Sequence, residues 1–423
     1  MKREYTFRMP NWLVSAFNVA RPAIVLLTGV LFLWCLGQYL LTQALPDDLL
    51  AQRDLLVVAL TVTAGLFVIG CLYSFITRAY MQTYICAVCI LMGIGFAYQF
   101  FFGDFTKFFA MSFMGIALGI TAYFVYRKMN VLSDRLYWLC AGSILALLLM
   151  NVVFGKQING SRLWIDLKVF MFQPGELVKV LLIVLGASSF RNPIRGAAYC
   201  ALSLFSCAIL LFLKDLGGVL TIFSLFILMT YLLFDHKGVS TLIVVAAISG
   251  LIIALRCMPY AAARFANWGQ AMSNPDSLQQ RKYIIGVLMG GFKGLGVADH
   301  SLFTNVYAAQ NDGALAGVMA VLGVPVVSAT LGSYAIISSQ ALVNRSVYTS
   351  SFFIHAEIAL FMAVQVLLNF AGALDLLPFT GVVAPLVSSG GTAIFCSHML
   401  LGIGAAALNP ALKVYQEVER GYE

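Results

Sequence analysis

The stretch that decides the fold is a polar passage that runs directly into an apolar one. It reads NGSRLWID at 159–166 and QPGELVK at 173–179, followed by VLLIVLGASSF at 180–190. A helix needs about 20 residues to cross the apolar core of a bilayer, so a span that ends at Phe190 begins near Met171. Glu176 and Lys179 then lie inside the membrane, where charged side chains are costly and usually face a protein interior or a watery cavity. The rest of the chain is expected to form the scaffold around them.

Composition places the chain among polytopic helical membrane proteins. Its 423 residues are 61% hydrophobic and only 10% charged, with a mean hydropathy of +0.91, which excludes an ordinary soluble domain. The net charge of +8 does not indicate nucleic-acid binding, because the basic residues are scattered singly between apolar runs. Such residues act as topology determinants.

Apolar runs predict an all-α fold with about 12 transmembrane helices. They lie at 20–42, 54–76, 81–101, 106–126, 134–154, 171–190, 196–213, 217–234, 240–256, 312–338, 349–372 and 384–408. We expect a single integral membrane domain, with five N-terminal spans in 1–154 and a core that bears the polar motifs in 155–410. One long extracytoplasmic loop, 257–311, separates spans nine and ten, and 278–289 within it suits a short interfacial helix.

Loop charge sets the expected topology. Basic residues before the run at 196–213 and after the run at 217–234 place both connections on the cytoplasmic side, so the chain crosses twice between them. The overall Lys and Arg bias favours a cytoplasmic N-terminus and a cytoplasmic C-terminus. The N-terminal segment has no small-residue cleavage site, so we expect no cleavable signal peptide.

Four polar constellations fall on the outer side in this topology. They are 159–179, KDLGG at 214–218, the glycine-rich GGFKGLG at 290–296 leading to TNVYAAQNDG at 304–313, and LPFTG at 377–381 with PLVSSGGT at 385–392. Each has a plainer interpretation. Glu176 can cap a helix and pair with Lys179 at i+3, the second and third segments can be simple turns, and the fourth a helix break. A broken span is also tolerated where it lines a cavity.

Taken together, these segments resemble the SEDS family (shape, elongation, division and sporulation proteins, the RodA/FtsW type) from about Gly160 to Pro410. The family's Gly-Ala-x-Arg-Trp-Ile/Leu-x-Leu and Gln-Pro-Ser-Glu-x-x-Lys are similar to GSRLWIDL at 160–167 and QPGELVK at 173–179. Its Asp-Leu-Gly, Gly-Gly-Leu-x-Gly-x-Gly and Leu-Pro-x-Thr-Gly segments match 215–217, 290–296 and 377–381. The resemblance implies a glycosyltransferase that polymerises lipid II, the lipid-linked disaccharide-pentapeptide, into peptidoglycan. That activity serves cell shape, division or sporulation.

The chain departs from the family pattern at several positions. Leu163 stands where the family has arginine, with Arg162 one position earlier, and Gly175 and Ser389 replace a serine and a tyrosine. The family's catalytic aspartate aligns with Asn305, which cannot act as a base. Asp312 is the nearest carboxylate, and a short deletion precedes it.

Carried over residue by residue, the resemblance implies a site at the outer membrane surface. Its catalytic candidates are Asp312 and Asn305. Its substrate-binding candidates are Arg162, Trp164, Gln173, Glu176, Lys179, Asp215, Lys293 and Ser388. A carboxylate suits deprotonation of an acceptor hydroxyl. Lys179, Arg162 or a divalent cation such as Mg or Mn suits the departing diphosphate. No grouping of residues has metal-ligand spacing.

Three functions remain open from the sequence. The first is a glycosyltransferase of the bacterial cytoplasmic (inner) membrane, with lipid II as substrate and a class B penicillin-binding protein as partner. The second is a flippase of a lipid-linked precursor, which buried charges and a broken span also suit. The third is a catalytically impaired scaffold for a transpeptidase, which Asn305 supports. Nucleic acid is not an expected partner.

Overall fold

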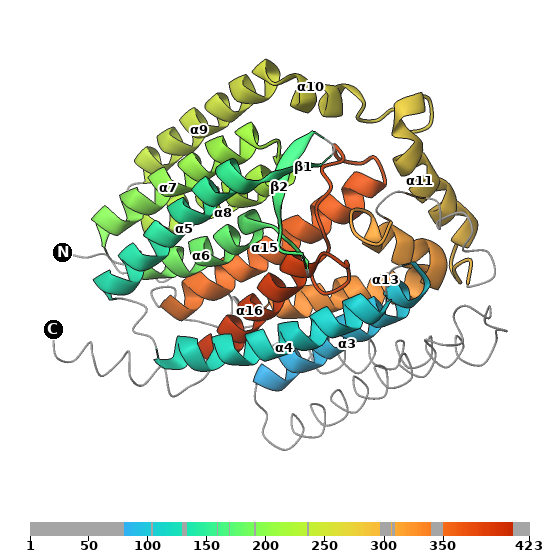
Figure 1. Ribbon diagram of the computed structural model, residues 1–423, viewed down its shortest axis with the longest axis horizontal. Coiled ribbons are helices and arrows are strands. Elements are labelled where there is room, and N and C mark those ends of the chain that lie inside the picture. Colours follow the sequence, from blue (N-terminus) through green and yellow to red (C-terminus); the bar gives the residue numbers. More distant parts are fainter. Residues whose placement is uncertain are drawn as a thin grey trace.

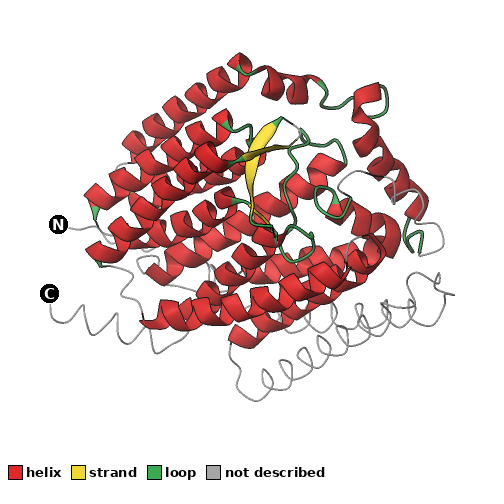
Figure 2. Ribbon diagram, in the orientation of Figure 1, coloured by secondary structure: helices red, strands yellow, loops and turns green. Residues whose placement is uncertain are grey.

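The computed structural model describes residues 80–102, 105–128, 133–158, 160–168, 170–189, 192–234, 237–296, 306, 309–339 and 350–408. The expected spans 20–42 and 54–76 and the candidate residue Asn305 lie outside these ranges. The described residues form a helical bundle whose long helices run roughly side by side (Figures 1 and 2).

Each of the ten expected spans within the described ranges contains a helix. The helices that form the bundle are α3 (Tyr80–Phe102), α4 (Phe105–Lys128), α5 (Asp134–Phe154), α6 (Pro174–Ser188), α7 (Pro193–Phe212), α8 (Leu216–Leu233), α9 (Lys237–Cys257), α13 (Ala314–Ser338), α15 (Ser350–Ala373) and α16 (Gly391–Ala407). Seven of the described helices are long and apolar enough to cross a membrane. The chain is therefore a mostly helical, multi-pass membrane protein, and α7 and α8 are separate helices as expected.

The predicted all-α fold did not include the three short strands at one end of the mostly helical bundle. Residues 156–172 form three short antiparallel strands, β1 (Lys156–Ile158), β2 (Ser161–Asp166) and β3 (Met171–Phe172), in the order β1-β2-β3. Gly160, with φ +79, makes the tight turn between the first two strands. Helix α6 consequently starts at Pro174 instead of Met171, since proline suits the first helical turn.

Helix α16 is also shorter than its apolar run, because residues 384–390 are not helical. Pro385 precedes Leu386, which has φ +67, a backbone conformation that breaks a helix. The amide of Gln99 in α3 supports this segment by donating to Val387 O at 2.8 Å and Gln310 O at 2.9 Å. The non-helical chain inside the bundle therefore keeps its hydrogen bonds, as membrane depth requires.

The segment between α9 and α13 contains α10 (Pro259–Ala266), the 3-10 turn η1 (Pro275–Ser277) and α11 (Leu278–Gly290). Helix α11 confirms the short helix expected at 278–289. The glycines after it serve backbone packing: Leu295 N donates to Ala320 O at 2.8 Å, and a Cβ on Gly294 would lie 2.3 Å from Val321 O. They dock on α13 where that helix is kinked, at Gly323 with φ +85.

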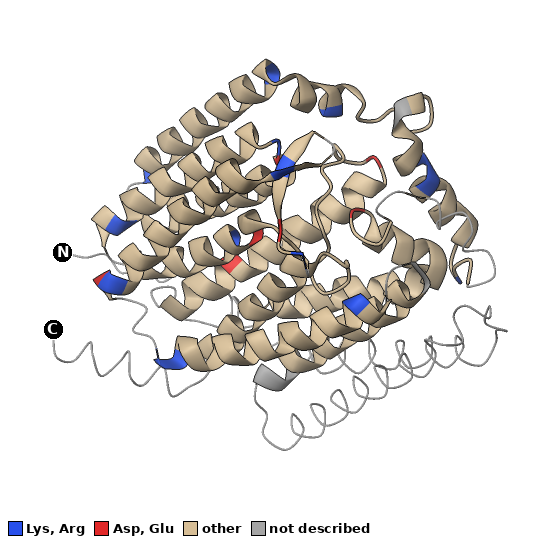
Figure 3. Ribbon diagram, viewed as in Figure 1, with Lys and Arg blue, Asp and Glu red and all other residues tan. Residues whose placement is uncertain are grey.

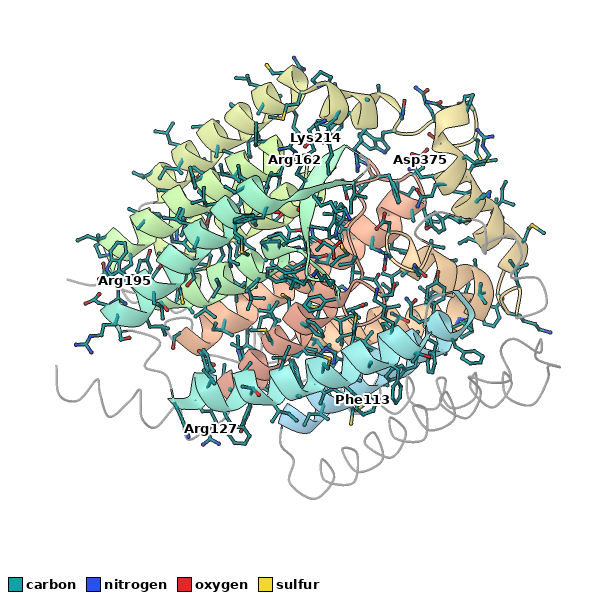
Figure 4. The ribbon with its side chains drawn as sticks, viewed as in Figure 1. Phe113, Arg127, Arg162, Arg195, Lys214 and Asp375 are labelled. Carbon is teal, nitrogen blue, oxygen red and sulfur yellow. The ribbon has the colours of Figure 1, made fainter. Side chains whose placement is uncertain are left out.

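Most charged residues lie toward the two ends of the bundle, and Glu176, Lys179 and Glu357 are buried exceptions. Figure 3 shows most of them at helix ends and in connections. Figure 4 shows Arg127 and Arg195 at one end, and Arg162, Lys214 and Asp375 at the other. The turns that carry the polar constellations thus meet at the end where the strands lie.

Candidate functional site

A buried ion pair at the start of α6 is the first component of the site. Lys179 Nζ lies 2.6 Å from Glu176 Oε1, and both side chains are buried. A surface cap on the helix would remain solvated, so the simple capping interpretation of Glu176 is wrong. Burial of two charges is costly unless the pair is close and further hydrogen bonds complete it.

Lys179 has the further partners that this burial demands. With the Gln365 amide in α15 assigned the orientation that satisfies both of its polar atoms, its oxygen accepts from Lys179 Nζ at 3.1 Å and its nitrogen donates to Val383 O at 2.9 Å. The ammonium also lies 5.8 Å from the ring centroid of Phe361, within the range of a cation–π contact. The ion pair therefore ties α6 to α15 and to the connection that precedes α16.

The tip of the α7–α8 hairpin places a second carboxylate near this ion pair. Asp215 caps α8 by accepting from Gly218 N at 2.7 Å, and a Cβ on Gly175 would lie 3.7 Å from Asp215 Oδ2. Burial raises the pKa of Asp215 above its ordinary value, and the nearby Lys179 ammonium partly opposes this rise. Asp215 therefore belongs to the site and is not part of a solvated turn.

The strand turn docks on the same hairpin tip. Arg162 N donates to Leu213 O at 3.3 Å, Ser161 Oγ donates to Lys214 O at 3.5 Å, and Figure 4 labels Arg162 and Lys214 at the same end of the bundle. Neighbouring residues of a strand face opposite sides. Leu163 is buried and Arg162 is exposed. Arg162 therefore faces the opposite side of the strand from position 163, where the family has its arginine.

Asp312 is positioned by the broken segment before α16. Ser388 Oγ donates to Asn311 O at 2.8 Å, and Ser389 Oγ donates to Asn311 Oδ1 at 2.7 Å. Asn369 in α15 donates to the same Asn311 carbonyl at 3.0 Å. Three side chains thus fix the residue directly before Asp312.

The carboxylate of Asp312 lies against Gly381. A Cβ on Gly381, which has φ +69, would lie 3.4 Å from Asp312 Oδ2. Asp312 retains partial exposure, so a ligand can reach it. Burial raises the pKa of Asp312 to about 6, and the Arg264 guanidinium opposes that rise. Asp312 is therefore mostly ionised at pH 7 while remaining a better base than an ordinary aspartate.

The consecutive residues Phe379, Thr380 and Gly381 connect the charged groups. Arg264 Nη1 in α10 donates to Phe379 O at 2.6 Å. Thr380 lies beside the α8 N-terminus, since a Cβ on Gly217 would be 3.4 Å from Thr380 O. Gly381 contacts Asp312. One short segment therefore contacts α10, the start of α8 and the residue Asp312 before α13.

The other candidates lie at varying distances from this segment. The backbone N–H of Gln173 donates to Thr392 Oγ1 at 3.0 Å, which joins α6 to α16. Trp164 is half-buried on β2 and packs against the main core. Lys293 is exposed in the turn after α11, and no hydrogen bond or ion pair within the described ranges joins it to the other candidates.

Sequence reasoning missed three residues of the site. Arg264 is only one charge of the long loop in the sequence, Tyr260 stands in no motif, and Gln365 lies within an apolar run. The i, i+4 spacing of Tyr260 and Arg264 in a segment that starts with proline was a usable signal for one face of a short helix. Gln365 offered a weaker one, as a polar side chain in the middle of a span.

The family model for FtsW/RodA/SpoVE, described as cell cycle protein, matches residues 94–409. A peptidoglycan glycosyltransferase RodA from Mycobacterium bovis is 25% identical over 268 residues, which are 58% of this chain and 57% of the relative. The chain thus spans little more than half the length of that relative. A probable peptidoglycan glycosyltransferase FtsW from Tolumonas auensis is 27% identical over 310 residues, which are 69% of this chain and 78% of the relative.

Two solved structures share the fold. One is a chain of a peptidoglycan synthase complex that coordinates polymerization and crosslinking, with a TM-score of 0.61 at 22% identity over 77% of this chain and 96% of that chain. The other is a mutant of the Rod shape determining protein RodA from Thermus thermophilus, with a TM-score of 0.53 at 23% identity and the same coverage of both chains. Since the family model covers most of the sequence, the chain belongs to the FtsW/RodA/SpoVE family.

Proposed function

We propose that this protein is a peptidoglycan glycosyltransferase of the bacterial inner membrane that polymerises lipid II at the outer membrane face. The observation that carries the proposal is Asp312, a carboxylate with a raised pKa that lies against Gly381 and near the Arg264 guanidinium. The names of the relatives support the reaction class. The remaining charged residues of the site are Glu176, Lys179, Asp215 and Arg264.

Asp312 is the proposed general base. In polymerisation, the 4-hydroxyl of an acceptor sugar loses its proton and attacks the anomeric carbon of the donor, and the donor's polyprenyl diphosphate leaves. A base whose pKa lies just below the working pH is suited to this step, because it is ionised and still binds a proton. In this proposal Asp312 performs the role that Asn305 cannot.

The departing diphosphate requires positive charge. Arg162, at the start of β2, and Lys214, in the turn between α7 and α8, lie at the same end of the bundle (Figure 4). Neither forms an ion pair within the described part of the chain, whereas Lys156 pairs with Asp166. We assign Arg162 and Lys214 to the diphosphate. A divalent cation bound with the substrate would supply the same charge, although no cluster of three or more metal-ligating side chains occurs among the described residues.

A scaffold function is the second candidate, because Asn305 replaces the expected catalytic aspartate. The likeness to a chain of a synthase complex supports a penicillin-binding protein as partner. The scaffold and the enzyme differ in one respect: only the enzyme needs the raised pKa and partial exposure of Asp312. A flippase would need the buried polar groups around Lys179 but would not need a general base.

Purified protein in liposomes with fluorescent lipid II separates the three functions. Glycan polymer from the wild-type protein supports the glycosyltransferase. Movement of the precursor between leaflets without polymer indicates a flippase. Binding of a class B penicillin-binding protein with neither polymer nor movement indicates a scaffold and overturns the proposal.

A further inference from the structure

Two buried hydroxyl groups in the site lack hydrogen-bond partners among the described residues. They are the phenol of Tyr260 in α10 and Oγ1 of Thr380. Buried polar groups are nearly always paired, and each exception calls for an explanation. Both lie next to groups already placed in the site.

Their positions follow from the contact between α10 and the 379–381 segment. Tyr260 lies one helical turn before Arg264, so both side chains leave the same face of α10. Arg264 Nη1 donates to Phe379 O, and Thr380 is the next residue. The pKa of Tyr260 is raised to about 12 by burial and, secondarily, by the Asp215 carboxylate. The phenol therefore lies near Asp215 as well as near Arg264.

Charge decides which part of a substrate suits this place. The carboxylates of Glu176, Asp215 and Asp312 outnumber the two cations, Lys179 and Arg264, so phosphate is disfavoured beside them. Hydroxyl and acetamido groups of a sugar are neutral, and they both donate and accept, as do the phenol and the threonine hydroxyl. Tyr260 as a whole residue is half-buried, and its phenol oxygen is the buried part.

We propose that Tyr260 and Thr380 form a sugar subsite that binds the acceptor saccharide and orients its hydroxyl toward Asp312. The subsite rests on the proposed function in so far as the sugar belongs to a lipid-linked precursor. In this arrangement the diphosphate binds near Arg162 and Lys214, and the acceptor sugar binds near α10. It also gives α10 a function that its place in a connecting loop does not reveal.

The test uses Tyr260→Phe and Thr380→Val, which remove one hydroxyl each and keep the shape. Tyr231→Phe is the matched control, because its phenol hydrogen-bonds to Thr241 Oγ1 at 3.1 Å, away from the site. For each variant we would measure KM and kcat for fluorescent lipid II, its equilibrium binding and the thermal stability of the protein. A subsite predicts a KM roughly 3- to 10-fold higher, as expected for loss of one hydrogen bond, with thermal stability unchanged or higher because an unpaired polar group is gone.

The binding measurement separates this inference from the proposed function. If the wild-type protein binds lipid II without polymerising it, the glycosyltransferase fails, and weaker binding by Tyr260→Phe and Thr380→Val still supports the subsite. Wild-type KM and binding in both variants would overturn the subsite even if polymerisation is confirmed. Failure of the wild-type protein to bind lipid II would overturn both.

Discussion

The guanidinium of Arg264 donates a hydrogen bond to the carbonyl oxygen of Phe379 at 2.6 Å. This contact joins α10, in the segment between α9 and α13, to the segment before α16, across 115 residues of sequence. It places a positive charge beside Asp312 without a direct ion pair. Arg264 therefore adjusts the base and also holds the loop, and these two effects can be separated.

Replacement of Arg264 by Gln should shift the pH dependence of polymerisation. The Asp312 pKa is about 6 and Arg264 lowers it, so loss of the guanidinium raises that pKa. Because the base acts when ionised, the acidic limb of the rate profile moves to higher pH, by about one unit. Arg281→Gln is the control, since Arg281 holds the loop through Ala271 O and Asn274 O. A similar shift in both variants would assign the effect to loop disorder.

The buried pair of Glu176 and Lys179 should show strong coupling in stability. Lys179→Met leaves a carboxylate buried without its partner, which costs about 3–5 kcal/mol. Adding Glu176→Gln removes that uncompensated charge, so the double variant should be more stable than Lys179→Met alone. Thermal unfolding in detergent measures all four proteins of the cycle. Additive losses in the double variant would show that the two side chains do not act as a pair.

Gly217 should tolerate no side chain while Val382 is present. A Cβ at position 217 would lie 2.3 Å from Val382 Cγ2, whereas one at Gly142 meets nothing within 4 Å. Gly217→Ala should destabilise the protein by about 1–3 kcal/mol, and Gly142→Ala should be neutral or slightly stabilising. Adding Val382→Ala to Gly217→Ala should recover part of the lost stability, because it removes the Cγ2 atom that the new Cβ would contact. No recovery would mean that the backbone of α8 had moved instead.

Asp375 should control local opening of the segment between α10 and α11. Its carboxylate accepts from Gly269 N at 3.0 Å, Ala271 N at 2.8 Å and Gln280 Nε2 at 3.2 Å. Asp375 has φ +60, so Asn and Gly are the replacements that keep the backbone unstrained. Asp375→Gly and Asp375→Asn should speed amide hydrogen exchange at 268–272 roughly 10-fold and leave α3 unchanged. Wild-type protection in this peptide would rule out an anchoring role.

The sequence was sufficient for those features that depend on local pattern. Long apolar runs predicted the helices, Pro174 marked a helix start, and the charge of Glu176 and Lys179 at membrane depth indicated a buried pair. Strand β3 was missed because the span length was counted back from Phe190, which extended the helix past Pro174 to Met171, whereas β1 and β2 lie outside that span. Short polar strands also carry little hydrophobic pattern.

The site itself depends on contacts between distant segments, which local pattern does not specify. Ser388 was predicted as a binding residue, yet its hydroxyl is used to hold Asn311. Loop charge alone does not single out Arg264, whose importance comes from its hydrogen bond to Phe379 and its effect on Asp312. Asp312 was identified from the sequence as the nearest carboxylate, but its raised pKa follows from burial that only the fold reveals.

The central claim is that Asp312 acts as the base, and Asp312→Asn tests it most directly. The change keeps the shape and removes the ionisable group. Because the folded-state pKa of Asp312 is raised to about 6, its ionisation at higher pH destabilises the fold, so the variant should be at least as stable as wild type near neutral pH. Any loss of activity then cannot be attributed to unfolding.

The decisive measurement is the rate of glycan polymer formation from fluorescent lipid II by wild type, Asp312→Asn and Asn305→Asp with Asp312→Asn. We expect Asp312→Asn to lose activity by roughly 100-fold or more, as for removal of a general base, with lipid II binding retained. Polymerisation by Asp312→Asn at the wild-type rate would contradict the account, and recovery by the added Asn305→Asp would return the catalytic role to position 305.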